Sequence, residues 1–491
     1  MRGKSSYSTT NSAIPAADRR IFLAFVAILL IAGVCALAFN TPLWMALPLA
    51  ALGLAVLVVD WRWVYYVLLF TLAFSMEIPL PGGLSMDVPT EPLMLVLLAC
   101  FGVNMLLGRS TVEGRFWVHP LVIIIGQALI WAAVVTLFSV DTTKSIKYLL
   151  AKTWYIVPFV FVTLAVVRRP SDVWRVAACH VAGACITFLY TFARHAGYGF
   201  SFDGINPALL PFYKNHVAYA ATLSMLIPYA LYAARQPDLG LLWRWLWRAA
   251  FGMLLLGVVL SYTRASMASL PLAVGFYFVI RWRLTRVALI SAALAAAAGS
   301  FYFVSQNNYM LYAPDYEKTV FYGDDFGKHL EATYNLEDLS GMERVYRWVA
   351  AARMISDRPI TGSGPNTFYP EYKKYTVTSF RTYVSRNPEQ STTHNYFLLM
   401  LAEQGIPGFL LFAILVAAAL LMVERLYHRS HSAEHRRVVL AAGLSLFIII
   451  THLLLNELVE VDKVGSFFYI ALALLMRAEG WIKDENVALT E

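Results

Sequence analysis

Four short polar clusters stand out in this chain because apolar residues flank each of them. A neutral imidazole can act as a general base on a hydroxyl. Guanidinium and ammonium groups can hold the oxygens of a phosphate, and amides can orient a polar substrate. The candidate site residues are Lys214, Asn215, His216, Arg264, Arg344, Arg347, His394 and Asn395.

The first cluster, Lys214-Asn215-His216, directly precedes an apolar segment that we expect to be a helix. A helix N-terminus carries the positive pole of the helix dipole, so a cation, an amide and an imidazole there suit a phosphate or diphosphate. Lys214 is the predicted diphosphate ligand, and Asn215 and His216 are predicted to bind substrate. The alternative is that Asn215 is an ordinary helix N-cap.

The second cluster is a short turn of small hydroxyl residues, 261–266, that contains Arg264. The planar fork of an arginine matches phosphate oxygens, and neighbouring hydroxyls can donate beside it. We therefore predict that Arg264 binds a diphosphate. The alternative is an arginine that snorkels to lipid phosphates.

The third cluster lies within a polar stretch at residues 306–393, and the fourth directly follows this stretch. A stretch of this length is too long for a simple connection. Apolar residues at helical spacing within 341–354 predict an amphipathic helix. On it, Arg344 is a candidate diphosphate ligand and Arg347 a candidate substrate ligand, unless they form a solvated face. His394 and Asn395 follow at the start of a long apolar helix; His394 is the predicted catalytic base and Asn395 a predicted substrate ligand.

Neither a metal nor a cofactor is predicted. The acidic residues of the polar stretch, Asp324, Asp325, Glu337 and Asp338, are interpreted as solvated rather than as metal ligands. The four cysteines lie in apolar segments without metal or redox spacing, so we expect free, buried thiols.

The composition predicts an all-α polytopic integral membrane protein with about 12–14 transmembrane helices and one large, partly helical loop outside the membrane. Hydrophobic residues make up 59% of the 491 residues, charged residues 14%, and the mean hydropathy is +0.59. The candidate spans are 21–38, 43–59, 64–76, 92–107, 121–138, 146–167, 173–192, 217–234, 245–262, 266–280, 287–304, 396–423, 438–455 and 466–476. The third and the last are short, so either could be tilted or re-entrant.

Arginine and lysine residues alternate with bare or acidic loops along this order of spans, which places both termini in the cytoplasm and the large loop on the outer face of the membrane. The net charge of +8 therefore reflects topology rather than binding to nucleic acid. Lys144 and Lys463 fall on the outer side, where they either serve an anionic ligand or snorkel to lipid. The predicted parts are a disordered tail at 1–17, transmembrane helices at 18–305, the loop at 306–393, further helices at 394–480, and a tail at 481–491.

Several strings resemble the O-antigen ligase/polymerase family of bacterial membrane proteins. They are Ser261-Tyr262-Thr263-Arg264-Ala265, the block from Arg344 through Gly362-Ser363-Gly364-Pro365-Asn366, and His394-Asn395-Tyr396 running on to Glu403-Gln404-Gly405-Ile406-Pro407-Gly408. The resemblance extends over residues 213–411. It implies transfer of a glycan from undecaprenyl diphosphate to an acceptor hydroxyl in the periplasm, without metal. In the family's pattern, His394 corresponds to the histidine thought to activate the acceptor and Arg264 to the arginine thought to hold the diphosphate.

The residues leave the acceptor open. An exopolysaccharide or O-antigen polymerase would use a second glycan, whereas a ligase would use lipid A-core, and we slightly favour the polymerase. The expected partners are the lipid-linked donor, one of these acceptors, membrane lipids and other envelope polysaccharide assembly proteins, in the bacterial inner membrane. The alternatives of another class are a lipid-linked glycan transporter and a membrane scaffold.

Overall fold

The computed structural model describes residues 60–80, 84–109, 112–237, 239–312, 339–377, 385, 387 and 391–489. Contacts divide the chain into two units, residues 1–65 and 66–491. The first unit is described at 60–65, where α3 begins. All that follows concerns the second unit, and the predicted spans 21–38 and 43–59 lie outside the described residues.

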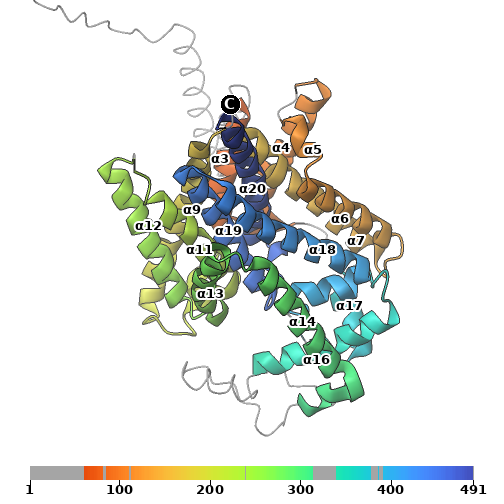
Figure 1. Ribbon diagram of the computed structural model, residues 1–491. Coiled ribbons are helices and arrows are strands. Elements are labelled where there is room, and N and C mark those ends of the chain that lie inside the picture. The colour runs from red at the N-terminus through yellow and green to blue at the C-terminus, as the bar shows by residue number, and fades with distance from the viewer. Residues whose placement is uncertain are drawn as a thin grey trace, which may run out of the picture. The chain divides into compact units, whose positions relative to one another are not determined.

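Helices make up almost all of the described chain (Figure 1). In order, the elements are α3 (Arg62–Thr71), η2 (Leu72–Phe74), β1 (Met76–Leu80), β2 (Leu84–Val88), α4 (Thr90–Leu106), α5 (Gly114–Trp117), α6 (Pro120–Thr136), α7 (Thr142–Ile156), the π-helical turn η3 (Val157–Val162), α8 (Thr163–Val166), α9 (Pro170–Gly197), α10 (Ile205–Leu209), α11 (His216–Ala233), α12 (Leu241–Leu260), α13 (Arg264–Arg281), α14 (Thr285–Val304), η4 (Ser305–Tyr312), α16 (Leu339–Asp357), α17 (Phe368–Tyr372), η5 (Lys373–Tyr375), α18 (Tyr396–Arg429), α19 (Ala433–Leu453), η7 (Leu458–Glu460) and α20 (Asp462–Ala488).

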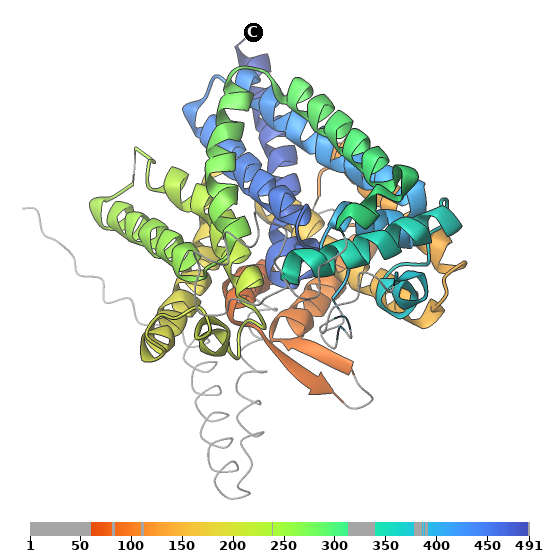
Figure 2. The ribbon, with the colours of Figure 1, turned by 90° about the horizontal axis from the view of Figure 1, so that it is seen from below.

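The predicted all-α membrane fold is confirmed. Each of the twelve predicted spans from 64–76 onward coincides with a described helix, and six described helices are long and apolar enough to cross a membrane. One small feature was not predicted: β1 and β2 form an antiparallel hairpin in which Met76 pairs with Val88 and Leu80 with Leu84 (Figure 2). The last span is also longer than predicted, because α20 has 27 residues.

Helix α20 forms the core of the described unit. Every residue from 462 to 480 is buried, and α11, α18 and α19 are among its neighbours (Figure 1). Small residues allow neighbouring helices to approach closely. Gly443 of α19 is an example, because any Cβ there would collide with the Val423 side chain of α18. In contrast, α14 exposes its apolar side chains, as expected of a helix that faces lipid.

The two ends of α20 carry separate groups of charged side chains. At its C-terminal end Glu479 accepts from His119 (2.9 Å) and Arg425 (3.0 Å), and Arg477 pairs with Glu113. At the N-terminal end Thr90 donates to Asp462 (3.1 Å). At about 1.5 Å per residue, the helix separates Asp462 from Glu479 by about 25 Å. Residues predicted for inner loops thus share one end and residues predicted for outer loops the other, while the orientation in the membrane stays a prediction.

Helix α18 is broken at Gly405, which has a φ of 67°. The polar stretch docks onto this break, where the N–H of Ile406 donates to the carbonyl of Pro359 (2.8 Å). The N–H groups of Ser363 and Gly364 in turn donate to carbonyls of the first α18 segment (3.0 and 2.9 Å).

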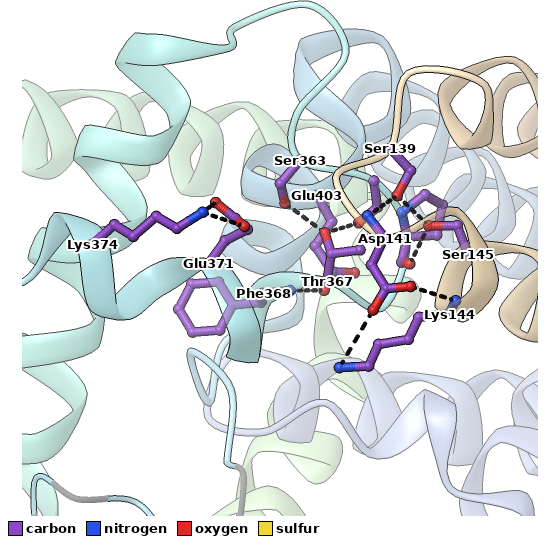
Figure 3. Close-up of polar contacts among 12 residues, drawn as sticks. Ser139, Asp141, Lys144, Ser145, Ser363, Thr367, Phe368, Glu371, Lys374 and Glu403 are labelled. Carbon is purple, nitrogen blue, oxygen red and sulfur yellow. Dashed lines mark hydrogen bonds and ion pairs between the residues drawn. The ribbon is translucent and has the colours of Figure 1, made fainter.

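The buried carboxylate of Glu403 completes this docking. It accepts hydrogen bonds from the N–H groups of Asn366 (2.9 Å) and Phe368 (2.8 Å) (Figure 3). The first turn of α7 joins the same cluster, since the Ser145 hydroxyl donates to the carbonyl of Pro365 (2.8 Å). The glycine-rich motif that follows His394 in the sequence is therefore the surface on which the loop rests.

We predict that Gly405→Ala destabilises the protein. Alanine at a left-handed φ costs about 1–2 kcal/mol, and its Cβ would also collide with the carbonyl of Ile360. The melting temperature of the purified protein in detergent should therefore fall. Gly299→Ala in α14 is the matched control, because a Cβ there meets nothing within 4 Å, and equal melting temperatures for the two variants would contradict the prediction.

Candidate active site

His394 lies where the polar stretch enters α18, and the neighbouring backbone is held by α16. Trp348 donates its indole N–H to the carbonyl of Thr393 (2.8 Å), and Arg347 donates to the carbonyl of Thr392 (3.4 Å). His394 itself has a φ of 52°, and Asn395 caps α18 by accepting from the N–H of Leu398 (3.0 Å). Because α16 holds the residues before His394 and α18 those after it, the imidazole has little freedom to move.

The surroundings of His394 keep the imidazole neutral. Its side chain is 27% exposed, and Nδ1 lies 3.8 Å from Oε2 of Glu457. Burial, followed by the positive charges of Arg347 and Arg344, lowers the pKa of His394 to about 3, while an interaction with Asn456 opposes the shift. A neutral imidazole beside two guanidinium groups can accept a proton when an anion lies nearby to offset them.

The clusters around Arg264 and His216 lie side by side. Thr263 donates to the carbonyl of His216 (3.3 Å), directly before Arg264 begins α13. The His216 ring is oriented by Asn206, whose Oδ1 lies 3.0 Å from Nδ1. The turn is further fixed by Tyr262, which donates to the carbonyl of Phe200 (2.6 Å).

The C-terminal end of α19 connects this pair of clusters to His394. Oγ of Ser266, near the start of α13, lies 3.2 Å from Nε2 of the buried His452. Asn456 and Glu457 follow within five residues and face His394. One short segment, 452–457, therefore contacts both the helix of Arg264 and the predicted base.

The structure brings Arg344 and Arg347 close enough to His394 to act on it electrostatically. Arg347 is buried and pairs with Glu343 (3.4 Å). This burial is incompatible with a solvated face for that arginine. The roles of both arginines toward a substrate stay predictions.

The other predicted ligands have structural partners. Asn215 is the N-cap of α11, accepting from the N–H of Ala218 (3.0 Å), so the alternative interpretation describes its position. Lys214 is exposed and pairs with Glu77 of the hairpin. Snorkelling is wrong for Lys463, which is buried and donates to the carbonyl of Ser75 (2.9 Å), whereas Lys144 lies 3.8 Å from Asp141.

Several candidates can be judged only where the chain is described. Asp324, Asp325, Glu337 and Asp338 lie outside the described residues. Within the described ranges, no group of three His, Cys, Asp or Glu residues could hold a metal ion. Cys100, Cys179 and Cys185 are free thiols, but they are half-buried rather than buried as predicted, and Cys35 lies outside the described residues.

Sequence reasoning missed the segment 456–460. In the predicted topology Glu457 and Glu460 belong to one of the acidic loops between spans, and neither is a predicted site residue. Glu460 accepts from Tyr396 (2.6 Å) and pairs with the buried Lys152 (2.8 Å), and burial raises the pKa of Glu457. The sequence does place these two carboxylates between apolar segments, close to Lys463. The partners of Glu460, which are Tyr396 and Lys152, lie far away in the sequence and could not be recognised from it.

The geometry defines an integral membrane protein with an imidazole and guanidinium groups at one edge of its helices, beneath a docked polar segment. Residues 249–413 match the family model described as O-Antigen ligase. This match confirms the resemblance of the sequence to the O-antigen ligase/polymerase family. Members of this family are glycosyltransferase-like enzymes that use lipid-linked glycans and acceptors in the membrane.

The matched segment contains Arg264, Arg344, Arg347, His394 and Asn395. It contains neither the start of α11 nor the segment 452–460, which the fold adds to the site. A comparison with curated proteins found no match.

We predict that Arg344→Gln raises the pKa of His394, because it removes a nearby positive charge. Histidine NMR chemical shifts across a pH titration in nanodiscs measure this directly. Arg353→Gln is the matched control, since Arg353 is an exposed arginine on the same helix. An unchanged His394 titration in Arg344→Gln would contradict the electrostatic account.

The same shift has a consequence for stability. The unfolded chain binds a proton at His394 with a pKa near ~6.5, whereas the folded chain does so at about 3. Between these values the unfolded state binds more protons, so the contribution of His394 to stability falls as the pH is lowered through this window.

Proposed function

We propose that this protein is a bacterial inner-membrane glycosyltransferase that transfers a glycan from undecaprenyl diphosphate to an acceptor hydroxyl in the periplasm. The observation that carries the proposal is the neutral His394 held beside Arg344 and Arg347 at the start of α18. The family match supports ligase or polymerase activity in general. Both termini are proposed to lie in the cytoplasm.

His394 is the proposed general base. It removes the proton of the acceptor hydroxyl while that oxygen attacks the anomeric carbon of the donor sugar. The bond from this carbon to the diphosphate breaks, and the diphosphate leaves with the electron pair. A single direct displacement inverts the anomeric carbon, and no residue has to form a covalent intermediate.

The lowered pKa of His394 fits this role once the donor is present. With a pKa of about 3 the imidazole is a weak base. A diphosphate bound between the arginines would offset their charges and raise the pKa. The base thus becomes effective when the leaving group is in place, which limits proton transfer without substrate.

Arg264 and Arg344 are the proposed diphosphate ligands, since developing negative charge on a leaving group is stabilised by preorganised cations. Lys214 is a weaker candidate, because Glu77 already neutralises it. Arg347, His216, Asn215 and Asn395 are proposed to position the substrate. The two asparagines use their side-chain oxygens as helix caps, so their amide N–H groups are what they can offer to a sugar.

The acceptor distinguishes two versions of the function. We favour a polymerase, which extends one lipid-linked glycan with another. The alternative is a ligase that moves the glycan to lipid A-core, and the family match is consistent with either version. A transporter is disfavoured because the outer cations surround a fixed, docked segment rather than a path through the membrane. Other envelope polysaccharide assembly proteins are expected partners.

We predict that His394→Ala lowers transfer by at least ~100-fold, the usual contribution of a general base. The measurement uses purified protein in nanodiscs with a lipid-diphosphate-linked glycan, with and without lipid A-core, and follows products on gels. Chain growth without core would identify a polymerase, and glycan moved to core a ligase. His431→Ala, an exposed histidine at the other end of the helices, is the control; full activity of His394→Ala would overturn the mechanism.

We predict that Arg264→Gln weakens donor binding by about 10- to 100-fold, as expected for the loss of a hydrogen bond between charged groups. Donor KM and inhibition by inorganic diphosphate both report on this contact. Arg281→Gln is the matched control, because Arg281 lies at the C-terminal end of α13 and Arg264 at its N-terminal end. Equal inhibition of the two variants by diphosphate would remove Arg264 from the proposed site.

A further inference from the structure

A cavity of about 350 Å³ lies at the outer end of α20, next to the proposed active site. Its walls come from the β1–β2 hairpin, α4, α7, the start of α11 and the segment 459–463. Glu460 lies in this wall and accepts from Tyr396, two residues after His394. The volume is at the small end of the ~300–1,000 Å³ typical of ligand pockets, which suits a single sugar residue better than a chain segment.

The lining of this cavity is strongly polar and has an excess of carboxylates. Three lysines face it, Lys152, Lys214 and Lys463, against five acidic residues: Glu77, Asp87, Glu91, Glu460 and Asp462. Lys152 is paired with Glu460 and Lys214 with Glu77. Lys463 uses its ammonium group on backbone carbonyls.

Asp462 accepts from the Thr90 hydroxyl, so two carboxylates remain for a ligand. Asp87 and Glu91 form no ion pair with any residue in the described part of the chain. Burial and the nearby Glu77 raise the pKa of Asp87, although Lys463 and Lys214 oppose this. Such an environment disfavours an anionic ligand and offers acceptors to hydroxyl or amide donors.

A tyrosine provides an independent sign of a missing ligand. Tyr155 is 9% exposed, and its hydroxyl has no hydrogen-bond partner among the residues that the structure describes. The groups that act on it electrostatically are Asp462, Glu460 and Asp87, all in the cavity wall, so the phenol lies toward these carboxylates. A buried hydroxyl without a partner is costly, and a ligand in the cavity would supply one.

We propose that this cavity binds an uncharged sugar residue of the lipid-linked glycan and rejects uronic acids and other anionic sugars. Asp87, Glu91 and Tyr155 would hydrogen-bond the sugar hydroxyls, and the rings of Trp154 and Tyr148 offer apolar faces to the sugar ring. This specificity deepens the proposed function and rests on it. It also separates two environments: arginines face the diphosphate, and carboxylates face the sugar.

The test measures binding without turnover. The full-length protein in nanodiscs is titrated with the methyl glycosides of N-acetylglucosamine and of glucuronic acid, followed by saturation-transfer NMR. We expect the uncharged glycoside to bind and the uronate not to bind. Asp87→Asn with Glu91→Gln should weaken the uncharged glycoside roughly tenfold, from the loss of hydrogen bonds to charged groups, and should allow the uronate to bind.

This gain of uronate binding distinguishes loss of specificity from misfolding. Tyr155→Phe should weaken the uncharged glycoside without admitting the uronate. Glu371→Gln is the matched control, because Glu371 pairs with Lys374 away from the cavity. Equal binding of both sugars by the wild type, no binding of the uncharged sugar, or unchanged binding in the double variant would each overturn the proposal.

A parallel transfer assay separates this inference from the proposed function. Sugar binding with the predicted specificity but no transfer from any lipid-linked donor would leave the cavity assignment in place and remove the enzymatic proposal. Transfer that is lost in His394→Ala but equally efficient for uncharged and anionic glycans would support the enzymatic proposal and remove the cavity assignment.

Discussion

The break in α18 at Gly405 is the constraint on which the region around His394 depends. A broken helix among apolar neighbours leaves backbone groups unsatisfied, and each of them is costly away from water. Here the segment 359–364 supplies the partners, from the Pro359 carbonyl to the N–H groups of Ser363 and Gly364. The polar stretch and α18 consequently stabilise one another, and the docking of the loop fixes the end of α18 that carries His394.

A second junction, at the end of α19, joins the site to the rest of the helices. His452 contacts Ser266 on α13, and Glu457 faces His394 a little further along the chain. Glu460 then bonds Tyr396 on α18 and Lys152 on α7. Because the segment 452–460 contacts α7, α13 and α18, movement of any one of these helices would shift the groups that surround His394.

The charges around this junction divide into two regions with opposite properties. On the side of α16, guanidinium groups lower the pKa of His394 and favour a bound anion. On the side of the hairpin, carboxylates exceed ammonium groups and disfavour one. A lipid-linked glycan has the same division, with its charge in the diphosphate and hydroxyl groups in the sugar. This match between substrate and surface connects the proposed base, the diphosphate ligands and the sugar cavity.

The sequence by itself determined the membrane class and the position of nearly every long described helix, and it is the source of the proposal that His394, Arg264 and Arg344 belong to the site. Hydropathy and helix capping are local properties, so Asn215 was recognisable as an N-cap before its partner was known. The tertiary structure decided what depends on distant partners. Hydropathy shortened α20 to 466–476 because Asp462, Lys463, Arg477 and Glu479 look exposed in sequence, yet all four are buried with partners elsewhere in the chain. Glu457, Glu460 and the acidic cavity were missed for the same reason: a charge is stable in such a place only if folding brings its partners to it.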